Sequence, residues 1–297
     1  MTLDTEISRE RRINDVLYHI HRNLDGDLRV SGLAKVAAYS DFHFQRCFKV
    51  VTGESVNDYV RRTRLERCAN LLVFNPTLSI QRAAAQCGLS SPASFSRSFK
   101  EYFGVSPKQW RNGGHRRYSA ENLQQNWGDE LRRQLTEPCH LAFPEVRIDV
   151  LQAQAVAYVR HRGYDRSINR AYDKLRVWAA MHGVPWQQDK LLGLLHSNPD
   201  IVPADACHYV ACLQIEQENI RRGPVCFMTI PGGPHARLSV KGKFGDLLPV
   251  LHHFYHHWLP ESGYILGNTP AFVGYRQCHF VDPDESFDLD LFVPISL

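Results

Sequence analysis

Hydrophobic positions near the start of the chain recur at the spacing of a helix with one buried face. They lie at i, i+3, i+4, i+7 and i+11, a period typical of an amphipathic helix. Asp25-Gly26-Asp27 follows and ends this helix. The apolar positions are Ile13, Val16, Leu17, Ile20 and Leu24.

A helix-turn-helix pattern comes next. Residues 30 to 38 are rich in small side chains and predict a compact helix, and Ser40 is placed to cap a second one that ends at Gly53. Ser55 then caps a long helix running to about Phe74. Asn75-Pro76 closes it, because the residue before a proline disfavours the helical region.

The same pattern recurs 51 positions later. A repeat of this kind steers the prediction of the whole fold. It predicts an all-α front segment with two helix-turn-helix units joined by the long helix. The superimposed pairs are Ala34 on Ala85, Phe44 on Phe95, Arg46 on Arg97, Phe48 on Phe99, Lys49 on Lys100, Gly53 on Gly104, Ser55 on Ser106 and Tyr59 on Trp110.

Each unit has the side chains that a helix in the DNA major groove requires. Phenylalanines at i and i+4 brace its inner face, and Arg46 and Arg97 occupy the equivalent outward position, from which arginine can contact guanine. Solvated surface arginines are the alternative interpretation. The candidates for phosphate contacts are Lys49, Lys100 and Arg61.

The back of the chain alternates strands with helices. Strands are expected at 147–150, 155–160, 191–196, 209–215, 225–230, 235–241, 272–275 and 287–293, and helices at 168–181 and 246–258. The order recurs once, so the pattern predicts an α+β domain of two facing modules.

Composition and charge narrow the function. Of 297 residues 43% are hydrophobic and 22% charged, as in a folded protein. There is no apolar run of the roughly 20 residues that span a membrane and no secretion signal, so we expect a cytoplasmic protein. Through Arg117 there are 19 Lys and Arg against 11 Asp and Glu, a balance of +8, while the rest balances at −4. A basic front suits a polyanion, although it also serves solubility.

Cysteine and histidine give no metal site by spacing alone. The eight cysteines lack any C-x-x-C pair and are expected to be buried in a reducing compartment. His252, His253, His256 and His257 form two i, i+4 pairs, a spacing that can hold a transition metal. No third ligand is visible, so a solvated helix face is preferred, and neither a metal nor a cofactor is expected.

The stretch from Ala85 to Arg111 closely resembles the signature of the AraC/XylS family of bacterial transcription regulators, and residues 34 to 64 resemble its first helix-turn-helix. The resemblance covers residues 10 to 112 and implies two recognition helices in successive major-groove segments. Pro92 and Ala93 depart from the polar residues usual there, so readout would rest on Arg97, a thymine methyl or DNA shape. The implied base-contacting residues are Phe42, Gln45, Arg46, Pro92, Ala93, Ser94 and Arg97.

Residues 140 to 297 resemble the GyrI-like small-molecule-binding domain, through Gly163-Tyr164, Gly242-Lys243-Phe244, residues 258–264 and residues 270–275. The order of the two parts resembles Rob-type regulators. It implies a DNA-binding domain at 1–112, a linker with one short helix at 113–138, and an effector-binding domain at 139–297.

Departures from the second family bear on the ligand. Many members carry a glutamate two residues before the tyrosine of the closing strand, whereas this chain has Val273 before Tyr275. His208 and Ala211 also replace the usual basic and acidic residues. We therefore expect a small neutral or weakly anionic ligand, or none. The candidate pocket residues are Tyr158, Tyr164, Trp178, Phe244, Phe272, Val273 and Tyr275.

These observations predict a ligand-responsive transcription regulator that binds double-stranded promoter DNA as a monomer and recruits or blocks RNA polymerase. It is not expected to be an enzyme. Two alternatives remain. The back domain could scavenge or hydrolyse an electrophile, using Tyr275 or Cys278, or it could bind another protein.

Overall fold

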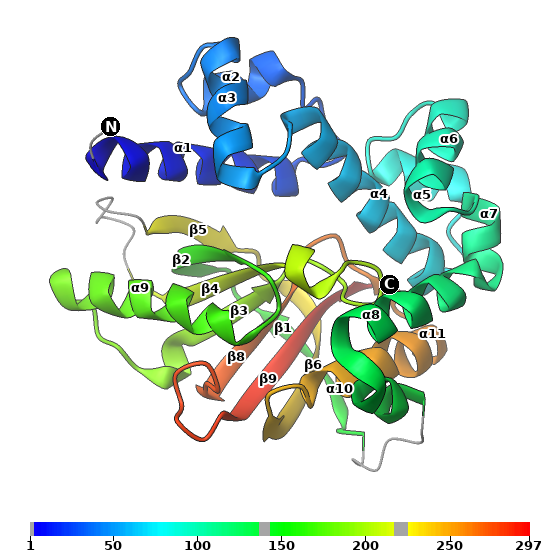
Figure 1. The fold of residues 1–297 in the computed structure, drawn as a ribbon. Helices are drawn as coiled ribbons and strands as arrows, with labels where there is room; N and C mark the ends of the chain where they lie inside the picture. Colours follow the sequence, from blue (N-terminus) through cyan, green and yellow to red (C-terminus); the bar gives the residue numbers. More distant parts are fainter. Residues whose placement is uncertain (1–2, 137–142, 217–224) are drawn as a thin grey trace. The chain divides into compact units, whose positions relative to one another are not determined.

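The computed structural model describes residues 3–136, 143–216 and 225–297. It divides into two compact units, Met1–Arg116 and Arg117–Leu297, called here the front unit and the back unit. Figure 1 shows helices alone in the first and a sheet with helices in the second. Among the described helices, none combines the length and the apolar character needed to cross a membrane.

The front unit contains the two expected helix-turn-helix pairs. Its apolar side chains pack into a core whose fully buried members include Phe44, Phe48, Phe99 and Trp110. The helices are α1 Leu3–Arg22, α2 Val30–Val36, α3 Asp41–Thr52, α4 Val56–Phe74, α5 Ile80–Gln86, α6 Pro92–Phe103, α7 Pro107–Gln109 and a π-turn Trp110–Gly114.

The two recognition helices, α3 and α6, are braced in the same way. The rings of Phe44 and Phe48 meet edge to face at 5.7 Å between centroids, and those of Phe95 and Phe99 at 5.6 Å. Each second phenylalanine then packs at a right angle on the equivalent aromatic residue, as in the pair Phe48 and Tyr59 at 5.5 Å. The internal repeat is thus a repeat of packing geometry as well as of sequence.

Glycine ends both recognition helices because the chain turns there through a left-handed conformation. Gly53 has φ 82° and Gly104 has φ 76°, values that other residues adopt only at a cost. The Ser55 and Ser106 hydroxyls each accept a backbone N–H of the following helix. Both chain reversals therefore use the same local devices.

The repeat carries an insertion that the gapless alignment missed. Helix α2 begins at Val30 and α5 at Ile80, a shift of 50, whereas α3 and α6 are shifted by 51. Ala34 therefore corresponds to the buried Ala84, and the exposed Ala85 is not its partner. The turn of the second unit is one residue longer.

The first turn places an alanine where the second uses glycine. Ala38 has φ 51° and Gly88, its counterpart, has φ 69°. A left-handed alanine costs about 1 kcal/mol relative to glycine. We expect Ala38→Gly to raise the free energy of unfolding by about 0.5–1 kcal/mol, measured by urea denaturation of the full-length chain. An unchanged or lower unfolding midpoint would contradict this.

The segment expected to be a linker with a short helix is mostly one long helix. Helix α8 spans His115–Thr136, and its Ser119, Asn122 and Leu123 are buried. The Asn122 amide donates to the backbone oxygens of Pro199 and Val202, at 2.7 and 3.3 Å. From Arg117 on, this helix thus belongs to the back unit, while the boundary expected at 138 and 139 and Cys139 lie outside the described residues.

The back unit is built on one antiparallel sheet with the strand order β1-β6-β9-β8-β3-β4-β2-β5, and β7 pairs with β9. Its strands are β1 Val146–Leu151, β2 Gln154–Arg162, β3 Leu191–Leu195, β4 His208–Gln214, β5 Cys226–Ile230, β6 Gly233–Lys243, β7 Ile265–Leu266, β8 Ala271–Gln277 and β9 Ser286–Ser296.

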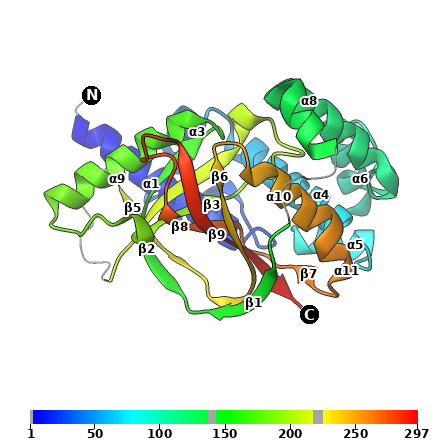
Figure 2. The same cartoon turned by 90° about the horizontal axis from the view of Figure 1, so that it is seen from below.

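Two modules of the same order make up this sheet, and they meet edge to edge through β3 and β8. Each module gives its first strand to the other, because β1 pairs with β6 and β5 pairs with β2. Figure 2 shows α9 near β2 and β5, and α10 toward the other end of the sheet. The helical segments are Arg166–Ile168, α9 Asn169–Met181, Gln188–Lys190, Ala204–Ala206, α10 Leu247–His253, a π-turn Phe254–Trp258 and α11 Leu259–Glu261.

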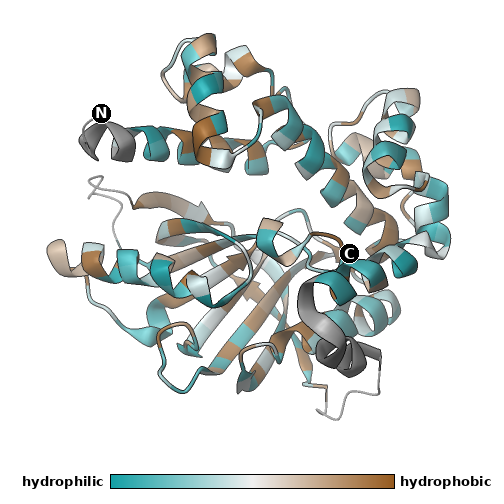
Figure 3. Cartoon of the chain, in the orientation of Figure 1, coloured by the Kyte–Doolittle hydropathy of each residue, from teal (hydrophilic) through white to brown (hydrophobic). Residues whose placement is uncertain are grey.

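Hydropathy follows this layering. Helix α9 buries one stripe, which includes Tyr172, Leu175 and Trp178, and Figure 3 shows hydrophilic turns along the rest of it and hydrophobic stretches in the strands. Such a stripe at helical spacing packs a helix on a sheet.

Candidate nucleic-acid interface and ligand pocket

Helix α3 presents a row of exposed side chains opposite its phenylalanine face. Phe42 is 80% exposed, and Gln45, Arg46 and Lys49 are also exposed. Arg46 has no hydrogen bond or ion pair with any residue that the structure describes. Its guanidinium is therefore available for a base edge.

Helix α6 presents the equivalent row. Pro92, Ala93, Ser94 and Lys100 are exposed, and Arg97 is 81% exposed at the side chain while its Nε lies 3.2 Å from Glu101 Oε1. Such an exposed i, i+4 pair is worth only a few tenths of a kcal/mol. Arg97 can therefore exchange its ion pair with Glu101 for a DNA contact at little cost in free energy. Arg46 has no such ion pair to break among the described residues.

A charged network that the sequence did not reveal joins the two helix-turn-helix units. Arg62 of α4 contacts Glu54 at 2.7 Å and Glu66 at 3.2 Å, and Tyr102 of α6 donates to Glu66 at 2.8 Å. Burial raises the pKa of Glu66, although Arg62 and Tyr102 oppose this. Arg61, expected to meet phosphate, is exposed and pairs with Asp58 on its own helix at 2.8 Å.

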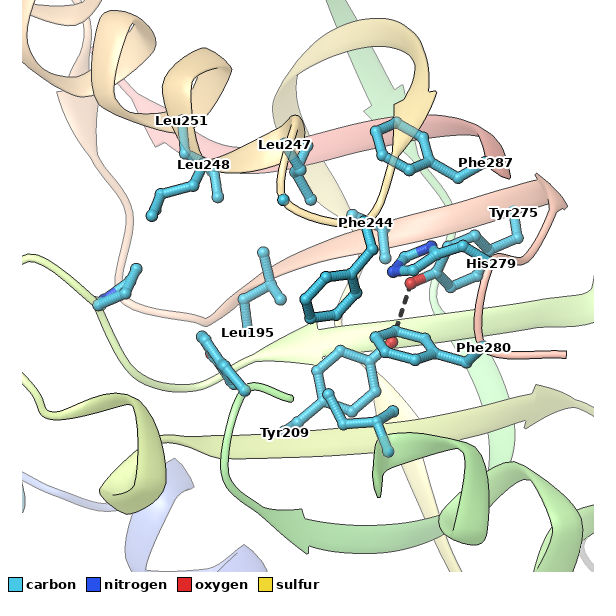
Figure 4. Close-up of a pocket in the computed structure, with 15 residues that line it drawn as sticks. Leu195, Tyr209, Phe244, Leu247, Leu248, Leu251, Tyr275, His279, Phe280 and Phe287 are labelled. Atoms are coloured by element: carbon cyan, nitrogen blue, oxygen red, sulfur yellow. Dashed lines mark hydrogen bonds between the residues drawn. The ribbon is translucent and has the colours of Figure 1, made fainter. Parts of the chain in front are cut away.

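The back unit contains a pocket between α10 and the central strands, shown in Figure 4. Its cavity volume is about 90 Å³, less than the roughly 150 Å³ of an engineered cavity that binds benzene. No Asp, Glu, Lys or Arg is among its lining residues. These are Tyr164, Ile168, Leu195, Pro199, Tyr209, Phe244, Gly245, Leu247, Leu248, Leu251, Val273, Tyr275, His279, Phe280 and Phe287.

A chain of three tyrosine hydroxyls lies beside the pocket, and two of these tyrosines, Tyr209 and Tyr275, line it. Tyr172 donates to the backbone oxygen of Leu192 at 2.9 Å, and its oxygen lies 2.8 Å from that of Tyr209, which lies 3.0 Å from that of Tyr275. Each hydroxyl has one proton, so Tyr209 donates to Tyr172 and Tyr275 donates to Tyr209. The Tyr275 oxygen is left with acceptor capacity for a ligand.

Gly193 makes room for this chain. A Cβ atom at Gly193 would lie 1.8 Å from the Tyr209 hydroxyl oxygen, and Gly193 is paired with Val273 on the neighbouring strand. Directly paired residues of antiparallel strands share a face. The small residue on β3 therefore lets Tyr209 lie flat across the sheet below the pocket.

His279 is the second polar group of the pocket. Its ring lies 4.0 Å from that of Phe280 and 5.9 Å from that of Phe244, and burial lowers its pKa to about 4. The imidazole is thus neutral at pH 7. Its Nδ1 atom is buried without a hydrogen-bond partner in the described structure. The site offers a neutral nitrogen and a phenolic oxygen.

Four of the seven residues expected to contact ligand line this pocket: Tyr164, Phe244, Val273 and Tyr275. The other three do not. Phe272 precedes Val273 on β8 and so points to the opposite sheet face, where it stacks on Phe292 at 4.9 Å. Tyr158 is paired with Cys212 and lies on that same opposite face.

Trp178 of α9 packs on Phe227 of β5 at 5.7 Å between ring centroids, in the contact between the helix and the sheet, and does not line the pocket. Its position on the apolar stripe of a helix indicated correctly that it is buried, but periodicity cannot distinguish a residue of the hydrophobic core from one that lines a ligand pocket.

The pocket is poorly suited to nucleophilic chemistry. Burial raises the pKa of the Cys278 thiol to about 12, which leaves it protonated at neutral pH and unreactive. Burial also raises the pKa of Tyr275 well above its usual value. The two residues suggested for a hydrolase are therefore held in their neutral forms.

Several pocket residues were missed in the sequence because they lack a motif. Tyr209 lies on β4, where apolar residues continue without alternation, and His279 and Phe280 follow β8 in a turn. Leu247, Leu248 and Leu251 carried one signal, since i, i+1 and i+4 on a short helix predict a buried face.

Two family models match the chain. One, described as a helix-turn-helix domain, matches residues 33–113. The other, described as a GyrI-like small molecule binding domain, matches residues 144–296. The first match lies within the front unit, and the second spans the sheet of the back unit.

Curated relatives match the two parts separately. The probable transcription factor PqrA of Proteus vulgaris is 34% identical over 107 residues, 35% of this chain and 87% of PqrA. The right origin-binding protein of Escherichia coli (strain K12) is 37% identical over 101 residues, 33% of this chain and 34% of that protein. The DNA gyrase inhibitor of Erwinia billingiae is 30% identical over 132 residues, 42% of this chain and 79% of the inhibitor.

Proposed function

The chain belongs to the GyrI-like small molecule binding family, and an AraC-type helix-turn-helix domain precedes its GyrI-like domain, as in the Rob-type architecture. We propose that it is a transcription regulator that reads promoter DNA and responds to a small molecule. We propose further that one chain suffices for DNA binding and that it acts by recruiting or blocking RNA polymerase.

The observation that carries this proposal is the repeated presentation of an exposed arginine on a braced helix. Arg46 and Arg97 lie opposite phenylalanine pairs with nearly the same ring distances, 5.7 and 5.6 Å. Two such helices in one chain can contact two groove segments. Through Arg117 the sequence carries 19 basic against 11 acidic side chains, which favours phosphate contacts.

The proposal predicts a footprint of two adjacent major-groove segments about one helical turn apart. We would measure it with full-length protein on the DNA upstream of its own gene, over a range of salt and with excess competitor DNA. Protection that survives competitor supports sequence-specific reading. Binding that disappears with moderate salt and leaves no footprint, with or without added ligands, would contradict it.

The pocket favours a small neutral ligand. Val273 is fully buried where a carboxylate would be needed to pair with an organic cation, and an unpaired buried charge is costly. The Tyr275 oxygen and His279 can each contact a hydrogen-bond donor. A ligand of the size of benzene or larger would require a lining side chain such as Phe244 or Phe280 to move.

Thermal unfolding tests this ligand class with matched compounds. Small neutral aromatic compounds should raise the unfolding temperature of the full-length chain, and their trimethylammonium counterparts should not. Val273→Glu should reverse the preference, because the new carboxylate is stabilised only by a bound cation. Cationic compounds that stabilise the wild type as well as neutral ones do would contradict the assignment.

A further inference from the structure

Three metal-ligating side chains meet beside the pocket. Asp200 follows β3, and His252 and His256 lie one turn apart where α10 continues into the π-turn. The Asp200 Oδ2 atom is 3.0 Å from His256 Nε2 and 3.5 Å from His252 Nδ1. All three ligand atoms lie within 4.8 Å of one another. The sequence had shown the histidine pairs without the carboxylate, which is far away along the chain.

We propose that Asp200, His252 and His256 form a binding site for a divalent transition metal ion of the zinc class. A tetrahedral ion with bonds of about 2.0–2.1 Å holds its ligand atoms about 3.3 Å apart. The two distances from Asp200 lie on either side of that value. The side chains can therefore close on an ion with small movements.

The donor set selects the class of ion. Two imidazole nitrogens and one carboxylate oxygen suit zinc, nickel or copper, whereas calcium and magnesium require mostly oxygen ligands. The Asp200 side chain is 7% exposed, and those of His252 and His256 are 25% and 21% exposed. The ion can thus enter from solvent on the histidine side, where water would take the fourth position.

Neighbouring groups order the segment that carries Asp200. The Asp200 backbone N–H donates to the Asn198 side-chain oxygen at 3.0 Å, which orders the turn. Pro199, which precedes Asp200, lines the pocket, and its backbone oxygen accepts a hydrogen bond from the Asn122 amide of α8. Leu251, beside His252, lines the pocket too. An ion here would therefore fasten the 198–202 segment to α10 at the pocket wall.

The chain contains its own control. His253 and His257 have the same i, i+4 spacing, and their rings stack at 4.8 Å. No carboxylate joins them in a metal-ligand group among the described residues. If spacing alone bound metal, both pairs would do so. If the buried carboxylate is required for binding, only the pair His252 and His256, which Asp200 joins, will bind metal.

The test is metal titration of the chelator-treated full-length chain. We expect one equivalent of Zn²⁺ by calorimetry, and with Co²⁺ the visible absorption of a four-coordinate site that Zn²⁺ abolishes. His253→Gln with His257→Gln should leave both results unchanged. His252→Gln with His256→Gln should weaken Zn²⁺ binding by more than about tenfold, the scale on which even groups behind the ligands act.

Circular dichroism would establish whether each variant is folded. If the double histidine variant is not folded, Asp200→Asn serves as the second test. It should weaken binding by a similar factor. Three results would overturn the proposal: no stoichiometric binding by the wild type, equal losses in the two histidine pairs, or unchanged binding in Asp200→Asn.

Discussion

Replacing Arg62 with alanine should destabilise the front unit by about 3 kcal/mol, because it leaves Glu66 buried without its counter-charge. The Arg62 side chain is 19% exposed and that of Glu66 12%, so solvent compensates little. Hydrogen exchange of α4 peptides in the full-length chain measures this local loss. Protection of α9 peptides in the back unit should be unaffected.

The loss should depend on pH. Burial already raises the pKa of Glu66 above its usual 4.5, and removal of Arg62 should raise it further. A carboxyl whose pKa is higher in the folded state takes up a proton on folding, so its penalty is relieved as the pH falls through that raised value. The deficit of Arg62→Ala should therefore shrink as the pH is lowered from neutrality through that raised pKa.

Glu66→Gln provides the matched background. With the carboxylate gone, Arg62→Ala should cost clearly less, and the difference between the two costs gives the coupling of the pair. Equal losses in both backgrounds and at every pH would show that Arg62 contributes by packing, for instance on the Tyr59 ring 5.0 Å away, and not by its charge.

Arg46→Ala should lower affinity for the operator by about 1–3 kcal/mol, with the loss confined to one base step. Lys49→Ala, one turn away on the same exposed face, should weaken all DNA sequences alike and reduce the salt slope by about one. Equilibrium binding to cognate and scrambled duplexes over a salt series separates the two. Equal losses on both duplexes for Arg46→Ala would contradict its role in base readout.

Arg97 offers a further comparison because it is paired with Glu101 in the absence of DNA. Arg97→Ala should resemble Arg46→Ala at the other half of the site, and Glu101→Gln should slightly strengthen binding by removing a repulsive carboxylate. If Arg97→Ala does not lower the affinity for the operator, the second recognition helix does not read bases through Arg97 and must depend on DNA shape.

The helices, the internal repeat and the succession of strands and helices along the chain could be predicted because each has a local sequence signal. Apolar periodicity marks α1, the glycines at 53 and 104 mark the ends of the recognition helices, and the serine caps mark their neighbours. The insertion between the two units escaped because alanine residues run together at 83–85. The exchange of β1 and β5 escaped because strand pairing depends on distant partners.

The pocket was only partly predictable for a similar reason. A sequence gives the alternation along β8, which separates Val273 and Tyr275 from Phe272, but not which face carries the ligand. Gly193 and Tyr209 interlock across two strands, and Asp200 reaches its histidines from another segment. Such groupings exist only after folding.

The exchanged first strands also bear on how the back unit can assemble. Strand β1 is the first strand of the back unit to be made, but among the described strands it pairs with β6 alone, and β2 must wait for β5. Neither half can complete its edges alone, so a chain arrested between them presents unpaired strand edges that invite aggregation. Long-range pairing of this kind is also slow to form. Synthesis of this unit therefore has a vulnerable interval, which lasts until its second half has emerged.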